Sequence, residues 1–298
     1  MTAPTSDRAA DPRRRVIAQL FAAAAAGSTS FYAFFTVAPL LALELTGSRA
    51  WSGLPGTCTV LGAAVGTALL SIAMTRAGRR AGLAAGFALG VCGGVLAIAS
   101  AMRERFTFLL GGAALLGVAH AATSLARFAA ADVVVPARRG LVLGTVLWAS
   151  TIGALLGPAL PRLGASLEAV GLDPRAGALV LVAAGYAVAA VLTAALRPDP
   201  SSLMIQVEAP SAAAGADALD WRAPDVVLAL VALVVGQLAM ISVMVVTPVH
   251  VHEGGHGVGA VGVVMATHFA GMFALAPLVG WLVPRAGAAA VIVAGMVI

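Results

Sequence analysis

The sequence predicts an all-α integral membrane protein built from two parallel six-helix repeats, of which the second is incomplete. The first observation is composition: 60% of the 298 residues are apolar, 10% are charged, and the mean hydropathy is +0.99. A water-soluble domain with a charged surface does not reach these values. The second is a series of long stretches free of Asp, Glu and Arg, and the third is a sparse pattern that recurs at a constant offset of 209 residues.

The apolar stretches predict the transmembrane helices. A helix that crosses the bilayer needs about 20 apolar residues, and eight stretches meet this requirement. They lie at residues 18–43, 52–74, 83–101, 107–126, 141–160, 177–196, 226–249 and 260–283. A ninth apolar run begins after Gly287 and the chain stops at Ile298, so we expect this last helix to be too short to span and the protein to be truncated there.

The arginines between these stretches predict the orientation. Arg13, Arg14 and Arg15 precede the first stretch, which exceeds the signal-peptide core of about 7 to 15 residues, so we expect a retained helix. With a cytoplasmic N-terminus, 13 of the 18 arginines, including Arg127, fall on the cytoplasmic side, as the positive-inside rule requires. We therefore expect a multi-pass protein of the cell membrane. Because the arginines are scattered rather than gathered in a patch, we expect no nucleic-acid partner.

The chain divides into four parts. They are a cytoplasmic tail (1–15), an N-terminal six-helix bundle (16–197), a cytoplasmic linker (198–224) and an incomplete C-terminal bundle with helices seven, eight and part of nine (225–298). The linker is rich in Pro, Ser, Asp and Ala, which is typical of a flexible connection. Because six helices precede it and six is even, the second copy of the repeat enters the membrane in the same direction as the first.

The repeat itself is carried by six matched positions. They pair Pro39 with Pro248, Glu44 with Glu253, Gly53 with Gly262, Gly62 with Gly271, Arg76 with Arg285 and Gly78 with Gly287. A repeat of about 200 residues is too long for a solenoid unit and has the length of half a membrane transporter.

The loop after the second helix resembles the loop signature of the major facilitator superfamily, G-x-L-a-D-R-x-G-R-R-x-x-L, at the same place in the chain. The matching positions are Arg76, Gly78, Arg79, Arg80 and Leu83. Ser71 and Thr75 replace the Gly and the Asp of the signature. The second copy keeps Gly280, Leu282, Arg285 and Gly287 but has Pro284 where the acid would stand. The resemblance extends over residues 16–298, although only this loop is specific.

The resemblance implies that this loop is a latch between conformational states. Asp132, at the cytoplasmic end of the fourth helix, is similar to an acid that partners the loop arginines in some members. We expect Asp132 to pair with Arg79 or Arg76 in the outward-facing state. The alternative is a solvated charge at a helix end.

The fifth helix carries Gly153, Gly157 and Pro158, which resemble the G-x-x-x-G-P antiporter motif of drug-exporting members. Small residues four apart let two helices approach closely, and the proline bends the helix. Plain helix packing is the alternative. The arginine that the superfamily often uses for proton coupling in the fourth helix would fall near Ala113, and it is missing.

Polar groups at membrane depth are candidates for the substrate pathway or for proton coupling, because they are costly there. The candidates are Ser28, Tyr32, Glu44, His120, Gln237, Met244 and His268. Ser28 and Gln237 are equivalent under the repeat. Ordinary contacts between helices are the alternative for each. Since the remaining interior is almost uncharged, we expect a neutral or weakly charged substrate.

Together these features predict a secondary active transporter, a proton-linked antiporter for efflux of small apolar or amphipathic compounds by alternating access. The alternatives are an importer or uniporter of a small neutral solute, and a non-transporting truncated membrane protein. We expect a monomer whose partners are the lipid bilayer and a small-molecule substrate. We expect no enzyme and no cofactor, because the spans contain no catalytic dyad. We also expect no metal, because the cluster of His250, His252, Glu253 and His256 matches no zinc spacing.

Overall fold

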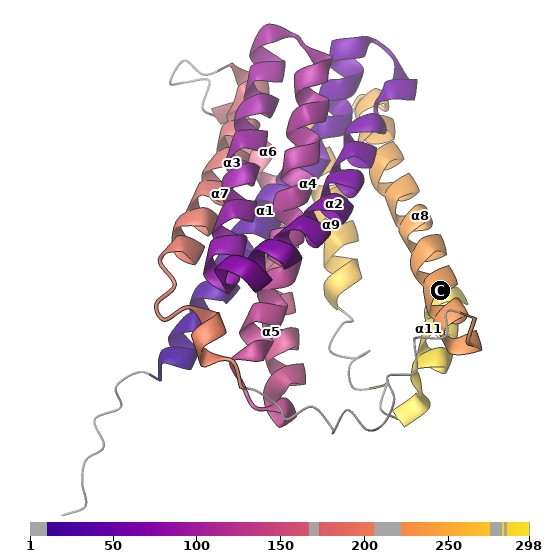
Figure 1. Ribbon diagram of the computed structural model, residues 1–298. Helices are drawn as coiled ribbons and strands as arrows, with labels where there is room; N and C mark the ends of the chain where they lie inside the picture. Colours follow the sequence, from indigo (N-terminus) through magenta and orange to yellow (C-terminus); the bar gives the residue numbers. More distant parts are fainter. Residues whose placement is uncertain (1–10, 167–172, 206–221, 275–281, 283–284, 298) are drawn as a thin grey trace, which may run out of the picture.

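The structure is a computed structural model that describes residues 11–166, 173–205, 222–274, 282 and 285–297 (Figure 1). Within these ranges all regular structure is helical, so the all-α prediction is confirmed. The helices are α1 (Pro12–Thr46), α2 (Leu54–Ala77), α3 (Arg79–Arg103), α4 (Phe106–Asp132), α5 (Pro136–Leu156), α6 (Leu160–Ser166), α7 (Pro174–Ala194), α8 (Pro224–Glu253), α9 (Val258–Ala274) and α11 (Ala288–Val297). Short 3₁₀ turns are η1 (Arg49–Trp51), η2 (Gly157–Ala159) and η4 (Pro200–Leu203).

Seven helical stretches in the described ranges are long and apolar enough to cross a membrane. They contain α1, α2, α3, α4, α5 with α6, α7 and α8, and they correspond to the first seven predicted spans. The eighth predicted span, 260–283, begins in α9, and most of its last nine residues lie outside the described ranges.

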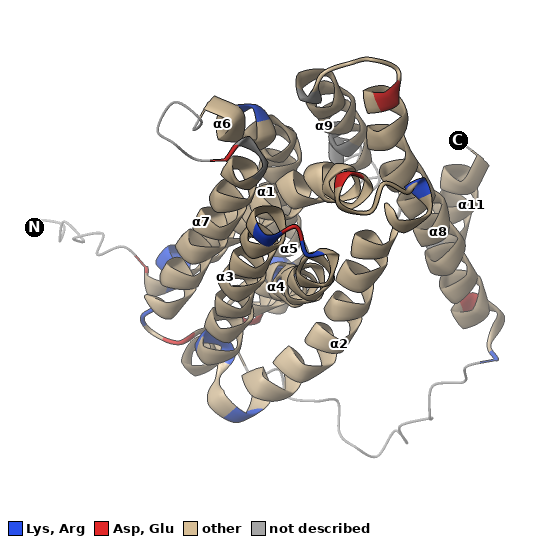
Figure 2. Cartoon of the chain, turned by 90° about the horizontal axis from the view of Figure 1, so that it is seen from above, with Lys and Arg blue, Asp and Glu red and all other residues tan. Residues whose placement is uncertain are grey.

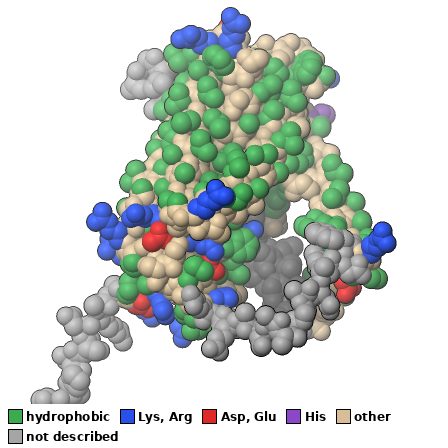
Figure 3. Space-filling view, in the orientation of Figure 1, with side chains coloured by type: hydrophobic (Ala, Val, Ile, Leu, Met, Phe, Trp, Pro, Cys, Tyr) green, Lys and Arg blue, Asp and Glu red, His purple; other side chains and the backbone are tan. Residues whose placement is uncertain are grey.

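Helix α1 begins at one end of the bundle, here called the basal end, and finishes at the other, the distal end; these are the lower and upper ends in Figure 1. Figure 3 shows apolar side chains over the middle of the molecule and arginines towards both ends. In Figure 2 the acidic and basic residues lie mostly at helix ends and in the connecting segments. Exposed apolar side chains such as Leu61, Val65 and Leu69 of α2 suit a lipid environment.

The first bundle packs through small residues. Helix α4 contacts α2 and α3 extensively, and α1 packs against α5 and α7. A side chain at Gly66 of α2 would place its Cβ 2.8 Å from the Val118 Cα of α4. Because lipid tails are as apolar as leucine, membrane helices associate mainly by such close backbone packing. Glycine is therefore required where these helices cross.

The second half meets the first at the distal end. Helix α9 contacts α5, η2 and α6, while α8 contacts α1 and α9. Gly53 and Gly56, at the start of α2, face Val245 of α8. Pro39 and Pro248 lie inside α1 and α8, at positions that the repeat relates. The two halves thus come together above the middle of the bundle.

Candidate functional site: a central cavity and a basal latch

The α2–α3 loop contains the predicted latch residues. Gly78 joins the two helices with φ +91°, a backbone conformation that favours glycine. The repeat-related Gly287 has φ +81°. This shared conformation explains why both copies of the loop keep a glycine where an L-residue would be strained.

Arg79 is brought together with Asp132. Its Nη2 lies 2.5 Å from Asp132 Oδ2, and each side chain is 24% exposed. The pair ties the first turn of α3 to the last residue of α4. Arg76, Arg80 and Arg285 are exposed.

Asp199 lies at the α2–α3 loop, a contact that the sequence analysis missed. Its Oδ1 accepts the Ser201 N–H at 2.8 Å, and its Oδ2 accepts the Arg80 N–H at 3.4 Å. Ser201 Oγ accepts the Arg79 N–H at 2.8 Å. Carboxylates are favoured at helix N-termini, where N–H groups lack partners. A carboxylate from the linker therefore lies at the α2–α3 loop, in which Thr75 replaces the acid of the signature.

The start of the linker is folded against the first bundle. The Ile205 N–H donates to the Asp132 carbonyl at 3.1 Å, and Arg139 Nη2 donates to the Ile205 carbonyl at 3.4 Å. The prediction of a flexible connection from residue 198 is wrong for 198–205, because these hydrogen bonds and the η4 turn hold that segment. Residues 206–221 of the predicted linker lie outside the described ranges.

The helix-five residues bridge α1 and the second half. The helix gives way to the η2 turn at Gly157, where Pro158 supplies no N–H to continue it. A Cβ at Gly157 would lie 2.7 Å from Tyr32 Cβ of α1, and one at Gly153 would collide with Ser28. On the other side, a Cβ at Gly262 of α9 would lie 2.5 Å from the Pro158 carbonyl oxygen. The motif therefore packs closely on two partners.

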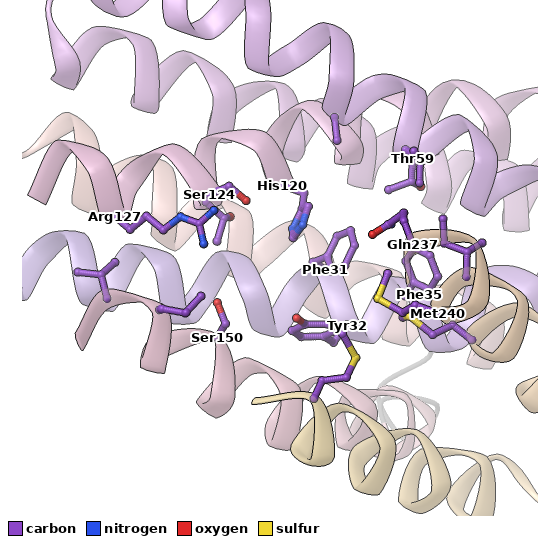
Figure 4. A pocket seen from close by; sticks show the side chains of 18 residues that line it. Phe31, Tyr32, Phe35, Thr59, His120, Ser124, Arg127, Ser150, Gln237 and Met240 are labelled. Carbon is purple, nitrogen blue, oxygen red and sulfur yellow. The ribbon is translucent and has the colours of Figure 1, made fainter. Parts of the chain in front are cut away.

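A cavity of about 290 Å³ lies between the two halves of the protein (Figure 4). Its walls come from α1, α2, α4 and α5 of the first bundle and from α8 and α9 of the second half. The polar or titratable lining residues are Tyr32, Thr59, His120, Thr123, Ser124, Arg127, Ser150 and Gln237. The aromatic and thioether lining residues are Phe31, Phe35, Met240, Met244 and Met272.

One face of α4 gives the cavity its polar wall. His120, Thr123, Ser124 and Arg127 follow the helical spacing i, i+3, i+4, i+7. Arg127 was expected on the cytoplasmic side, beyond the apolar run that ends at residue 126, and it lies within α4, which continues to Asp132. The recurrence of these four polar residues at intervals of three and four positions was the signal in the sequence that could have revealed this face.

His120 lies against the aromatic part of the cavity. Its ring stacks on Phe31 with centroids 3.8 Å apart and an interplanar angle of 18°. Tyr32 meets Phe31 edge to face, at 5.3 Å and 77°. Within the described chain, His120 Nδ1 is buried without a hydrogen-bond partner. Figure 4 shows Arg127 and Ser124 towards one end of the cavity and the aromatic and methionine side chains towards the other.

The other predicted pathway residues divide between lining and supporting positions. Tyr32, Gln237 and Met244 line the cavity with His120. Ser28 is buried behind it and donates to Ser150 Oγ at 3.2 Å.

Two of the predicted residues lie elsewhere. Glu44 lines a separate hollow of about 660 Å³ with Arg162 and His252, at the distal end. His268 is half-buried on α9 and is not among the lining residues.

An ion pair joins the two halves at the distal end. Arg49 Nε of η1 lies 2.5 Å from Glu253 Oε1 at the end of α8. The side chains are 74% and 29% exposed, so the pair contributes less than about 1 kcal/mol to stability. Its position suits a gate between the halves.

We expect Glu253→Gln to leave the melting temperature nearly unchanged but to open the distal end more often. The measurement is the labelling rate of a Ser150→Cys probe by an impermeant maleimide applied from the distal side, with Cys58 and Cys92 replaced by serine. We expect the rate to rise about two- to fivefold, as a loss of up to about 1 kcal/mol predicts. Arg103→Gln, which removes an exposed distal arginine, is the matched control and should not change it. An unchanged rate in Glu253→Gln would contradict the gate.

Comparison with known proteins identifies the family. Residues 20–298 match the sequence profile described as Major Facilitator Superfamily. The chain belongs to this superfamily. Two MFS-type transporters of Bacillus subtilis (strain 168), YdeG and YddS, both described as uncharacterized, are each 30% identical to this facilitator over 280 and 285 residues. These alignments cover 91% of this chain and 64% and 63% of the relatives, so the chain spans less than two thirds of their length.

A solved structure also resembles this facilitator. The crystal structure of an auto-inhibited POT family peptide transporter matches 93% of this chain and 55% of that chain, with 14% identity and a TM-score of 0.49. Membership of the superfamily confirms the predicted facilitator fold and a multi-pass membrane protein.

Proposed function

We propose that this facilitator is a secondary active transporter of the cell membrane that exports small amphipathic compounds by alternating access. The observation that carries the proposal is the central cavity, because both halves of the protein contribute its walls. A site between two bundles can be exposed to either side when one bundle rocks against the other. The lining supplies aromatic and thioether surface together with several hydrogen-bonding groups, which suits an amphipathic solute.

The contacts between the halves support an inward-open state. Val245 lies beside Gly53 and Gly56, Gly262 lies beside Pro158, and Arg49 pairs with Glu253, all on the distal side of the cavity. We propose that the basal end is cytoplasmic, in agreement with the excess of arginines there. The cavity would then be loaded from the cytoplasm. The Arg79–Asp132 pair, which was expected in the outward-facing state, is formed in this inward-open arrangement.

Export and proton coupling rest on two further observations. The packing of Gly153, Gly157 and Pro158 places the exporter-like motif between α1 and α9. Of the three titratable candidates predicted for coupling, His120 is the one that lines the cavity, whereas Glu44 and His268 lie elsewhere.

Everted membrane vesicles that contain the chain test this function. With an acidic interior, we expect them to accumulate at least one of two tritiated probes, 2-naphthalenesulfonate or 2-naphthalenesulfonamide, above vesicles that lack the chain. A protonophore should abolish the excess. Uptake that resists the protonophore would instead support a uniporter, and loss of probe preloaded into the vesicles would support an importer. No flux of either probe in either direction would overturn the proposal of transport by this chain.

A further inference from the structure

The cavity carries positive charge without a matching acid. None of its eighteen described lining residues is Asp or Glu, whereas Arg127 lines it. The two ion pairs between described residues use other arginines, Arg49 and Arg79. Arg127 Nε is buried without a hydrogen-bond partner in the described part of the chain, and its guanidinium carbon lies 5.1 Å from the Phe128 ring centroid. A guanidinium at membrane depth is costly unless a partner satisfies it.

The polar and apolar parts of the cavity are separated along its length. Arg127 and Ser124 lie nearer the basal end of α4, with the Ser150 hydroxyl across the cavity on α5 (Figure 4). Phe31, Tyr32 and Phe35 form the aromatic part, and the methionines of α8 face it. Aromatic and thioether groups favour contact with a planar ring. An anion with an aromatic body would match both parts at once.

We propose that this site selects small organic anions with an aromatic body. Arg127 binds the carboxylate or sulfonate by charge-assisted hydrogen bonds, and the Ser124 hydroxyl donates a hydrogen bond to the same group. The ring lies in the aromatic part of the cavity. This inference rests on the proposed function, deepens it, and replaces the expectation of a neutral or weakly charged substrate, which had counted Arg127 only among the cytoplasmic arginines.

Binding of a matched pair of probes tests the selectivity. The pair is 2-naphthalenesulfonate, an anion, and 2-naphthalenesulfonamide, its neutral counterpart. Scintillation proximity measures their binding to the purified full chain in phosphatidylcholine nanodiscs. We expect the anion to bind about tenfold more tightly, as one charge-assisted hydrogen bond predicts.

Variants of two arginines assign the effect to the cavity. Arg127→Gln should weaken sulfonate binding about tenfold and change sulfonamide binding less than about twofold. Arg127→Lys should keep part of the preference, since it keeps the charge but not the planar fork. Arg138→Gln removes an exposed arginine near the same end of the bundle and should leave both affinities unchanged. Size-exclusion profiles check that each variant is folded.

Three outcomes would overturn the inference. Equal affinities for the two probes in the parent chain would do so, as would an Arg127→Gln variant that weakens both alike. Displacement of the sulfonate by phosphatidylglycerol in the nanodiscs, lost in Arg127→Gln, would show that Arg127 binds a lipid headgroup instead. Vesicle uptake of both probes with equal affinity would contradict the anion preference but agree with the proposed transport. Selective binding without any flux would agree with the anion preference but contradict transport by this chain.

Discussion

Replacing Gly157 with leucine is expected to push helices α1 and α5 apart and to cost about 3 kcal/mol of stability, the upper range for overpacking. The new Cβ would lie 2.7 Å from Tyr32 Cβ, 2.8 Å from the Thr29 carbonyl oxygen and 3.0 Å from the Ala33 nitrogen. Two of these atoms belong to the backbone of α1 and cannot rotate away. Thermal unfolding in detergent measures the loss.

Gly144→Leu is the matched control for this substitution. Gly144 lies in α5, the helix that Gly157 caps. It is exposed, and a Cβ there would meet nothing within 4 Å. We expect this variant to unfold at nearly the parent temperature. If both variants unfold equally early, the effect belongs to glycine replacement in α5 in general and not to the contact with α1.

Asp132→Asn is expected to cost about 2 kcal/mol, because it leaves the Arg79 guanidinium without its carboxylate. The figure lies below the full loss for a buried pair, since both side chains are 24% exposed. The variant is also expected to change how often the basal end closes, which distance measurements between spin labels on α3 and α8 would follow.

A double-mutant cycle with Arg79→Gln isolates the pair. We expect the stability losses of the two single variants, added together, to be larger than the loss of the double variant by about 1 kcal/mol or more. This is the behaviour of residues in contact. Asp225→Asn, which removes an exposed acid from the first turn of α8, is the control and should change stability by a few tenths of a kcal/mol. Strictly additive losses would show that the ion pair contributes nothing in the membrane.

The apolar runs predicted the first seven spans well, because the bilayer imposes length and composition on a helix before any tertiary contact forms. Their ends were predicted less well. Helix α4 runs to Asp132 although its apolar run ends at residue 126, and α3 begins at Arg79 rather than at residue 83. Charged residues stop a hydrophobic run without stopping a helix, so Arg127 lies in α4 beyond the end of its apolar run.

Four of the seven predicted pathway residues line the cavity, since each interrupted an apolar run with a polar or polarisable group. Ser124 and Ser150 were missed, because small hydroxyls also occur at ordinary helix contacts. Asp199 could not be predicted as a cap of α3. Its contact joins residues 119 apart in the sequence and depends on where the chain returns after six helices.

Arg127 and Asp132 both lie on helix α4, which packs against α2, α3 and α1. They are five positions apart, which is a rise of about 7.5 Å along the helix axis. A rotation of α4 that turns the cavity arginine therefore also turns the carboxylate that engages Arg79. We therefore expect a substitution in α4 that reorients Arg127 to change the contact between Asp132 and Arg79 as well.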